Sequence, residues 1–466
     1  MEKETERGCG TTEPAERQLL DEAKREADRL DKKAGEPLEF FDLTKEGKVK
    51  KTILNFKSVL CYYGISLSYN LVRREIIYQI KDGRLSQALG TRECFDELVT
   101  YLVDVCCKEG LPAKRDDVYN WLYYIANESR FNYVKDSLAA YYESFKGYTG
   151  EFNRLMDCIK FKNNTEFSRL LFKKALWQSV AMIHNESGTY GADGALTLQG
   201  AQAIGKTSLL RKICECFGLE YFKESAEFSK YDRKDDILQN TSVFMCELGE
   251  AKKSVEQVDW MKRFITNPID EVRPPYARTA RKAPRLTTFY LTVNDHEFLK
   301  DTENRRYWTV EIQDINLNGI NAINYQALWA EAYSWYLENP VGFRLTHSER
   351  VQLNSINSEF RILSAEERVL LDCLDWEQPV EDWTEKTATQ ISTEILEETG
   401  QRISPQKVGT ALKGMGYEKE APLKSWRMLD GRALYSTPEA RKAVRTGTPY
   451  NRYMHGKVIP IDRSGT

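Results

Sequence analysis

The feature that most constrains this chain is a glycine-rich stretch at residues 195–207, with the letters A-L-T-L-Q-G-A-Q-A-I-G-K-T. Within it, four residues separate Gly200 from Gly205, and Lys206 and Thr207 follow directly. The apolar letters before it predict a buried strand, and L-L-R-K-I-C-E-C-F after it predicts a helix. A strand, a glycine turn and a helix in this order are typical of a phosphate-binding loop. The alternative is a glycine-rich turn with an incidental lysine.

Each part of this loop has a physical role in holding a nucleoside triphosphate. The glycines let the backbone wrap so that its N–H groups point at phosphate oxygens, and the helix N-terminus adds a favourable dipole. Lys206 is expected at the β- and γ-phosphates, and the Thr207 hydroxyl at Mg²⁺. The expected nucleotide-binding residues are Gly200, Ala201, Gln202, Ala203, Ile204, Gly205, Lys206, Thr207 and Ser208.

Composition sets limits on the rest of the chain. Its 466 residues predict two to four domains, and 41% hydrophobic with 29% charged residues is typical of a soluble globular protein. A net charge of −3 means that any nucleic-acid surface must be local. The sequence contains no apolar run of about 18 residues, so a membrane span is not expected. The start, M-E-K-E-T-E-R-G, lacks a signal-peptide core. The ten cysteines form no C-x-x-C pair, which favours reduced thiols in a cytoplasmic protein over zinc ligands.

The part before the phosphate loop predicts three regions. Residues 1–49 are charged and predict a solvated, partly disordered leader. Residues 50–148 show apolar positions at helical spacing and predict a small helical domain of unknown role. Its aromatic residues are expected in the core rather than as platforms for bases: Tyr62, Tyr63, Trp121, Tyr123 and Tyr124. From residue 149, further helices lead into a nucleotide domain that ends near residue 345.

Acidic residues follow a second strand of this domain. Val243–Cys246 predicts a short apolar strand, with Glu247 at its carboxyl end and Glu250 three residues on. Open α/β sheets place functional groups at such strand ends. Either glutamate is expected to hold the magnesium or orient the attacking water, and the sequence leaves the division of roles open. The alternative is an exposed acidic strand end.

A basic segment, D-E-V-R-P-P-Y-A-R-T-A-R-K-A-P-R, runs from Asp270 to Arg285. Three prolines exclude a helix, so a loop or hairpin is predicted. Its cations suit contacts with a nucleic-acid backbone, and the expected DNA-binding residues are Arg273, Arg278, Arg281, Lys282 and Arg285. Alternatively, these side chains pair with acids or face a neighbouring subunit's nucleotide.

Two further signals follow the basic segment. Thr288–Val293 predicts a core strand that ends at Asn294, an amide placed to position the hydrolytic water. Arg305 and Arg306 precede another strand, and one of them is a candidate arginine finger inserted across a subunit interface. Structural ion pairs are the alternative for both arginines.

The C-terminal part has a different pattern of predicted elements. Residues 346–444 are interpreted as a winged-helix nucleic-acid-binding domain, with helices from Thr387 and Ser404 and a hairpin that turns at Asp430-Gly431. From residue 400 onward, 13 Lys and Arg face 5 Asp and Glu, which supports a nucleic-acid surface. A protein-contact module is the alternative. Residues 445–466 predict a basic tail.

The chain resembles the virulence-associated protein E family of phages and genomic islands, whose nucleotide domain is similar to superfamily 3 helicases of the AAA+ class. The likeness spans residues 130–312 and is carried by L-Q-G-A-Q-A-I-G-K-T-S-L-L, V-F-M-C-E-L-G-E, V-R-P-P-Y-A-R and L-T-V-N-D-H-E-F-L-K-D-T-E-N-R-R-Y-W. It implies that Lys206 and Thr207 belong to Walker A, Glu247 to Walker B and Asn294 to sensor 1. The chain departs from the family pattern at two points. Thr292-Val293-Asn294 stands where Thr-Thr-Asn is usual, and Glu247 and Glu250 are not adjacent.

Together, motifs and resemblance predict a multidomain α/β protein: a helical N-terminal domain, an AAA+ P-loop core with a parallel sheet, and a C-terminal winged helix. The expected function is an ATP-hydrolysing DNA helicase or origin-melting protein of a phage or mobile element, with ATP and Mg²⁺ as cofactors. The resemblance implies a homo-oligomeric ring, a hexamer, with single-stranded DNA in its pore and duplex DNA at the winged helix. The rival is an ATP-switched host-interference or defence protein that separates no strands. A DNA-packaging motor is disfavoured because no acidic nuclease cluster follows.

Overall fold

The computed structural model describes residues 38–81, 95–226, 233–249, 255–272, 281–299, 304–419, 424–429, 432–440, 452–454 and 457–459. The predicted leader up to residue 37, Glu250, Arg273, Arg278 and most of the predicted tail lie outside these residues. The chain divides into two compact units. The larger comprises residues 1–252, 260–294 and 310–345, and the smaller comprises residues 253–259, 295–309 and 346–466.

The larger unit begins with a subdomain of helices around a small sheet. Its elements are α2 (Ile53–Tyr62), β1 (Ile65–Asn70), β2 (Glu75–Ile80), α4 (Phe95–Lys108), α5 (Arg115–Glu128) and β3 (Arg130–Phe131). The strand order is β2-β1-β3, with β1 antiparallel to β2 and parallel to β3. Phe56, Leu98 and Leu122 are fully buried in its core. The predicted helices are present, but the prediction missed this sheet, although I-S-L-S-Y-N in β1 alternates apolar and polar residues.

The aromatic residues of this subdomain are not all in its core. Tyr62 is 40% exposed and Tyr124 is 57% exposed, so the prediction that they are core residues was wrong. They lie on helices whose opposite faces carry the buried residues, and the aromatic count alone does not reveal the face.

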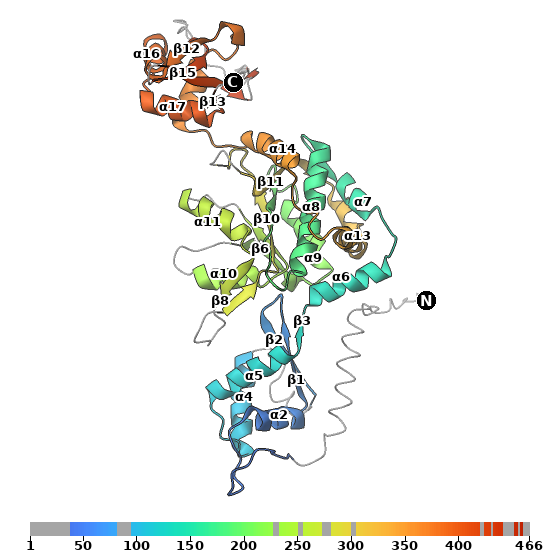
Figure 1. Ribbon diagram of the computed structural model, residues 1–466. Coiled ribbons are helices and arrows are strands. Elements are labelled where there is room, and N and C mark those ends of the chain that lie inside the picture. Colours follow the sequence, from blue (N-terminus) through green and yellow to red (C-terminus); the bar gives the residue numbers. More distant parts are fainter. Residues whose placement is uncertain are drawn as a thin grey trace, which may run out of the picture. The chain divides into compact units, whose positions relative to one another are not determined.

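A six-stranded sheet forms the centre of the larger unit (Figure 1). Its order is β4-β11-β5-β10-β7-β6, and β10 runs parallel to both β5 and β7. The strands are β4 (Ile159–Phe161), β5 (Ala195–Gln199), β6 (Phe222–Ala226), β7 (Met245–Leu248), β10 (Thr288–Val293) and β11 (Tyr307–Ile315). Every residue of β5 and β7 is buried, as expected for parallel strands covered on both faces. This confirms the predicted α/β fold with parallel strands, but the sheet is mixed, because β4 at its edge runs antiparallel to β11.

Helices cover this sheet, and Figure 1 shows α8, α9 and α13 gathered on one side of its strands. The helices are α6 (Tyr133–Ser144), α7 (Glu151–Asp157), α8 (Thr165–Ile183), α9 (Lys206–Glu215), α10 (Arg233–Thr241), α11 (Val255–Ile265), α12 (Leu317–Asn321) and α13 (Tyr325–Glu338). Trp329 of α13 is fully buried and donates to Ile213 O of α9 at 2.7 Å. That bond fastens the helix that carries the phosphate loop. A separate hairpin pairs β8 (Ile269–Val272) with β9 (Arg281–Pro284).

The smaller unit contains short helices and a four-stranded sheet. Its elements include α14 (His347–Ser358), α15 (Ala365–Cys373), β12 (Thr384–Thr387), α16 (Ala388–Thr399), α17 (Pro405–Gly414), β13 (Glu418–Lys419), β14 (Ser425–Leu429), β15 (Arg432–Thr437), β16 (Arg452–Met454) and β17 (Lys457–Ile459). The sheet order is β12-β15-β14-β13. As predicted, Thr387 caps one helix, Ser404 precedes the next, and β14 and β15 form a hairpin.

None of the helices described in either unit is long and apolar enough to cross a membrane.

Candidate functional site

The glycine loop joins β5 to α9, as the sequence predicts. A Cβ at Gly200 would lie 2.4 Å from Ile312 O, so no larger residue fits there. Gly205 precedes α9 with φ 96°, and a Cβ there would lie 2.6 Å from the side chain of Leu317. Ala203 also has a positive φ, 66°, a conformation that is unusual outside glycine. The backbone therefore turns tightly enough to direct its N–H groups into the loop.

Lys206, the first residue of α9, folds its ammonium back over this loop. Nζ donates to Gly200 O at 2.7 Å, to Ala201 O at 2.8 Å and to Asn294 Oδ1 at 2.8 Å. The residue is only 6% exposed. Asn294 follows β10, the strand next to β5, so neighbouring strands bring the lysine and the amide together.

Glu247 lies in β7, on the other side of β10. It is 1% exposed, and its Oε1 accepts from Thr207 Oγ1 and from Thr292 Oγ1, both at 2.6 Å. Its Oε2 is buried and has no hydrogen-bond partner among the residues that the structure describes. An unpaired buried carboxylate oxygen is costly, so this atom is suited to a ligand that supplies positive charge or a donor.

The residues of this site fit the cofactors that the motifs predict. A glycine loop that excludes Cβ atoms, with a buried ammonium above it, matches the needs of a polyphosphate. The Thr207 hydroxyl and the unpaired Glu247 oxygen are the hard oxygen ligands that Mg²⁺ prefers. Lys206, Thr207, Glu247 and Asn294 are thus brought together, as the order of strands predicts. Glu250 lies outside the described residues.

One contact of this site, that of Thr292 with Glu247, was not predicted from the sequence. Thr292 donates to the same oxygen of the Glu247 carboxylate as Thr207 does, Oε1. The signal was available, because Thr292 and Asn294 are two residues apart at the end of a strand and therefore face the same way. Gln199, at the end of β5, was also missed, and its Nε2 donates to Asn294 O at 3.3 Å.

Arg305 and Arg306 form a turn before β11 and belong to the smaller unit, whereas the glycine loop belongs to the larger. The turn is held by Asn357, whose Nδ2 donates to Asn304 O at 3.0 Å and to Tyr307 O at 2.9 Å. Arg305 is exposed and Arg306 half-buried. Neither forms an ion pair with a residue of the described ranges, and the neighbouring acids Asp301 and Glu303 lie outside those ranges.

The basic segment is a hairpin in its described part, as predicted. Arg281 and Lys282 on β9 are exposed. Arg285 is not: it is 1% exposed, it pairs with Asp270, and it lies 4.1 Å from the ring centre of Phe264. Its predicted contact with DNA is therefore wrong, and its role is structural. Arg273 and Arg278 lie outside the described residues.

The described cysteines are free thiols. Cys214 on α9 and Cys246 on β7 are fully buried, and burial raises the pKa of both thiols far above its ordinary value. These thiols stay protonated and unreactive beside the site.

The geometry and the fold define a class: an α/β domain with a phosphate loop whose lysine, carboxylate and sensor amide converge at one sheet edge. Residues 149–362 match the model of the virulence-associated protein E-like domain. The resemblance inferred from the motifs is thereby confirmed for this part of the chain, which carries a virulence-associated protein E-like domain. A comparison with curated proteins found no match.

Solved structures were also compared. Two apo structures of the NrS-1 C-terminal region are 13% and 12% identical and give TM-scores of 0.39 and 0.42. Each match covers 82% of this chain, and the two matches cover 97% and 98% of the NrS-1 chains. A JCV helicase with a bound N-substituted acetamide is 11% identical with a TM-score of 0.27, over 57% of this chain and 80% of its own. These superpositions are loose, and the domain assignment depends on the match over residues 149–362.

Proposed function

We propose that this chain is an ATP-hydrolysing replication protein that acts on DNA as a ring oligomer, a helicase or origin-melting factor of a phage or mobile element. It would work in the cytoplasm of the bacterial host. The observation that carries the proposal is the convergence of Lys206, Asn294 and Glu247 on the glycine loop. The virulence-associated protein E-like domain agrees with it.

Each residue has a role that follows from its position. Lys206 would bind the β- and γ-phosphates, exchanging its carbonyl partners for phosphate oxygens. Thr207 and Glu247 would hold Mg²⁺, which neutralises phosphate charge when bound. Asn294 would sense the γ-phosphate and orient the attacking water. Glu250 remains the candidate that shares the acid role with Glu247.

The arginine turn supports an oligomer. Arg305 and Arg306 carry guanidinium groups without an ion pair in the described structure, and one of them would reach the nucleotide of a neighbouring protomer. A site completed in this way forms only between subunits, so a closed ring, a hexamer, is the assembly that we propose.

Two surfaces are proposed for DNA. Arg281 and Lys282, with Arg273 and Arg278 of the same segment, would follow single-stranded DNA in the pore. The smaller unit would act as a winged helix on duplex DNA, because α16 and α17 are followed by the β14–β15 hairpin. Within it, Arg402, Lys413 and Arg432 are exposed and lack ion pairs with described residues, whereas Arg427 pairs with Glu385.

The test is DNA-stimulated ATP hydrolysis together with unwinding of a forked duplex. We expect the wild-type protein to hydrolyse ATP and separate strands, and Lys206→Ala to lose about 100-fold in kcat, the scale of losing one key transition-state contact. Unchanged hydrolysis in this variant would refute the assignment of the site. Slow hydrolysis without strand separation would instead identify an ATP-operated switch.

A further inference from the structure

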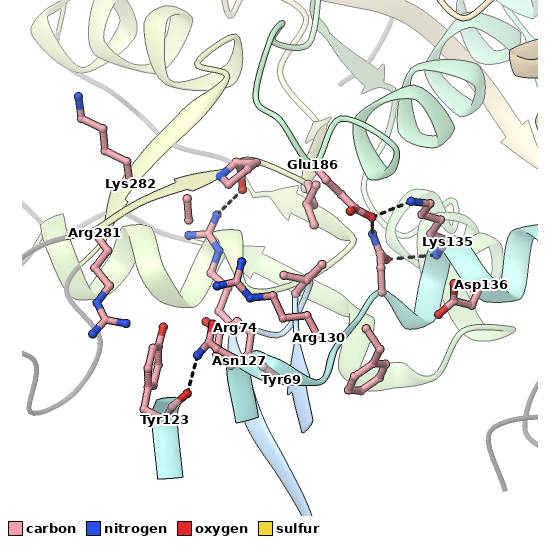
Figure 2. Close-up of a pocket in the computed structure, with 16 residues that line it drawn as sticks. Tyr69, Arg74, Tyr123, Asn127, Arg130, Lys135, Asp136, Glu186, Arg281 and Lys282 are labelled. Atoms are coloured by element: carbon pink, nitrogen blue, oxygen red, sulfur yellow. Dashed lines mark hydrogen bonds and ion pairs between the residues drawn. The ribbon is translucent and has the colours of Figure 1, made fainter. Parts of the chain in front are cut away.

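A second cavity lies in the larger unit, away from the glycine loop. It has a volume of about 630 Å³ and is lined by β1, β3 and α5 of the first subdomain together with β9 of the basic hairpin (Figure 2). This volume falls in the range of small-ligand sites, roughly 300–1,000 Å³. No residue of the cavity takes part in the phosphate-loop site.

The walls of the cavity are fixed to one another by the tip of the β1–β2 hairpin. Arg74 has a φ of +54° and donates to Asp270 Oδ2 at 2.6 Å, to Thr241 Oγ1 at 3.0 Å and to Pro284 O at 3.2 Å. Asn70 Nδ2 also donates to Tyr221 OH at 2.8 Å. A left-handed arginine persists only where its surroundings hold it, so this cavity is built into the fold.

The charge of the cavity is positive once its ion pairs are counted. Arg74 is neutralised by Asp270, and Lys135 pairs with Glu186 at 2.9 Å. Arg130, Arg281 and Lys282 have no ion pair with any residue of the described ranges. All three are exposed. The lining as a whole holds five Lys and Arg side chains and two carboxylates, those of Asp136 and Glu186, which leaves a surplus of positive charge.

The cavity also offers flat surfaces. The Arg281 guanidinium lies 4.3 Å from the ring centre of Tyr123, and the rings of Tyr69 and Tyr123 meet edge to face at 5.6 Å. The carbonyl of Tyr123 accepts from Asn127 Nδ2 at 2.7 Å, as Figure 2 shows. Bases of single-stranded nucleic acids stack on aromatic rings and on arginine planes of this kind.

From this combination we infer that the cavity binds a nucleotide unit of single-stranded DNA. Arg130 contacts its phosphate, and a base stacks on the Tyr123–Arg281 pair. Lys282, which points away from Tyr123 in Figure 2, contacts the next phosphate of the strand. A free nucleotide has the same chemistry, but Arg281 and Lys282 belong to the stem of the basic hairpin, so a continuous strand is favoured. The inference rests on the proposed action on DNA, and it gives the first subdomain a role in holding the strand.

The first test measures binding of a fluorescent oligo(dT) without ATP and with EDTA, as a function of salt. Arg130→Ala combined with Lys282→Ala should weaken binding about tenfold or more. It should also reduce the slope of log K against log salt by about 1.4, since each single-strand phosphate contact contributes about 0.7. Lys45→Ala combined with Lys48→Ala removes the same charge at exposed sites outside the cavity and should change affinity less than twofold.

The second test separates stacking from charge. Tyr123→Phe keeps the ring and should bind within twofold of the wild type, whereas Tyr123→Leu should lose about tenfold, the lower part of the range for one stacked base. Irradiation with an iododeoxyuridine oligonucleotide should cross-link a peptide that contains Tyr123 or Phe131. These measurements use the Lys206→Ala protein, so that the phosphate loop does not contribute.

The outcomes distinguish this inference from the proposed function. Equal DNA affinity of the cavity pair and the Lys45–Lys48 pair overturns the inference, while ATP hydrolysis by the wild-type protein leaves the proposed function standing. Binding of free dTMP by the protein, with no affinity for oligo(dT), also overturns it and identifies a free-nucleotide site. Absence of ATP hydrolysis in the wild type defeats the proposed function whatever the oligonucleotide does.

Discussion

Lys206 Nζ donates to Asn294 Oδ1 at 2.8 Å, although the two residues are 88 positions apart in the chain. One lies at the start of α9 and the other at the end of β10, so the contact joins the glycine loop to the strand between it and Glu247. If phosphate binds at the loop as proposed, a change in the position of the lysine would be passed directly to the amide. The pair links nucleotide binding to the group expected to orient water.

This contact predicts non-additive kinetics. Asn294→Ala should lower kcat for ATP by about 10- to 100-fold with KM within threefold, because the amide acts on the reacting water rather than on binding. The Lys206→Ala, Asn294→Ala double variant should be no slower than Lys206→Ala, since residues that act as a unit do not add. Steady-state hydrolysis assays measure both. Asn163→Ala, an exposed asparagine elsewhere in the domain, is the control, and full additivity would contradict the coupling.

Thr292 is predicted to be a positioning residue for Glu247. Thr292→Val keeps the shape but removes the donor at 2.6 Å, so the carboxylate is less well oriented and the Mg²⁺ concentration for half-maximal hydrolysis should rise about tenfold. Thr292→Ser should restore the wild-type requirement. A Mg²⁺ titration of ATP hydrolysis measures the effect. An unchanged titration with lower thermal stability would show a merely structural role.

The convergence of Lys206, Glu247 and Asn294 was predictable because it depends on topology. Each residue follows or ends a predicted strand or opens the next helix, and parallel strands bring such positions to one edge. The local signals also agreed with one another: apolar runs, then glycine, then a helical pattern. Where every level of the sequence points to one structure, prediction succeeds.

The burial of Arg285 was not predictable in the same way. It stands in a run of cations, and only the pairing of β8 with β9 turns it toward Asp270. Its partner lies 15 residues away, and no local pattern reports that contact. The β1–β2 hairpin was missed because its short strands lie between strong helical patterns. For Thr292 the sequence gives only part of the answer. Its spacing from Asn294 puts both residues on one side of the strand, but the hydrogen bond to Glu247 also depends on strand register, which the sequence of one strand does not fix.

The proposed arginine finger predicts complementation between inactive proteins. Arg305→Ala or Arg306→Ala should abolish hydrolysis in at least one case, and Lys206→Ala should abolish it through the phosphate loop. If the arginine acts across an interface, mixing these two proteins should restore part of the activity, because some interfaces combine an intact loop with an intact arginine. Mixing Lys206→Ala with Thr207→Ala is the control, since both changes damage the same loop. No recovery in the first mixture would place the arginine within its own protomer.

Asp270 is predicted to make stability depend on acid pH. It lies between Arg74 and Arg285, all three nearly fully buried. Burial alone would raise the pKa of Asp270, but the two guanidinium groups outweigh it and hold the pKa below its ordinary value. Since the unfolded carboxyl titrates near pH 3.9, the stabilisation is complete above about pH 4 and is lost as the pH falls toward the folded pKa. Urea unfolding between pH 3 and pH 7 should show this loss.

Replacing Asp270 should remove this pH dependence and also lower the free energy of unfolding. Asp270→Asn leaves two arginines buried without a counter-charge, so the free energy of unfolding at pH 7 should fall by about 3 kcal/mol or more. Asp157→Asn removes a carboxylate that pairs with Arg169 but is 70% exposed, and it should cost less than about 1 kcal/mol. Because Arg74 also fixes the wall of the DNA cavity, Asp270→Asn should weaken oligo(dT) binding as well. Equal stability of the two variants would show that the buried cluster does not hold the subdomain in place.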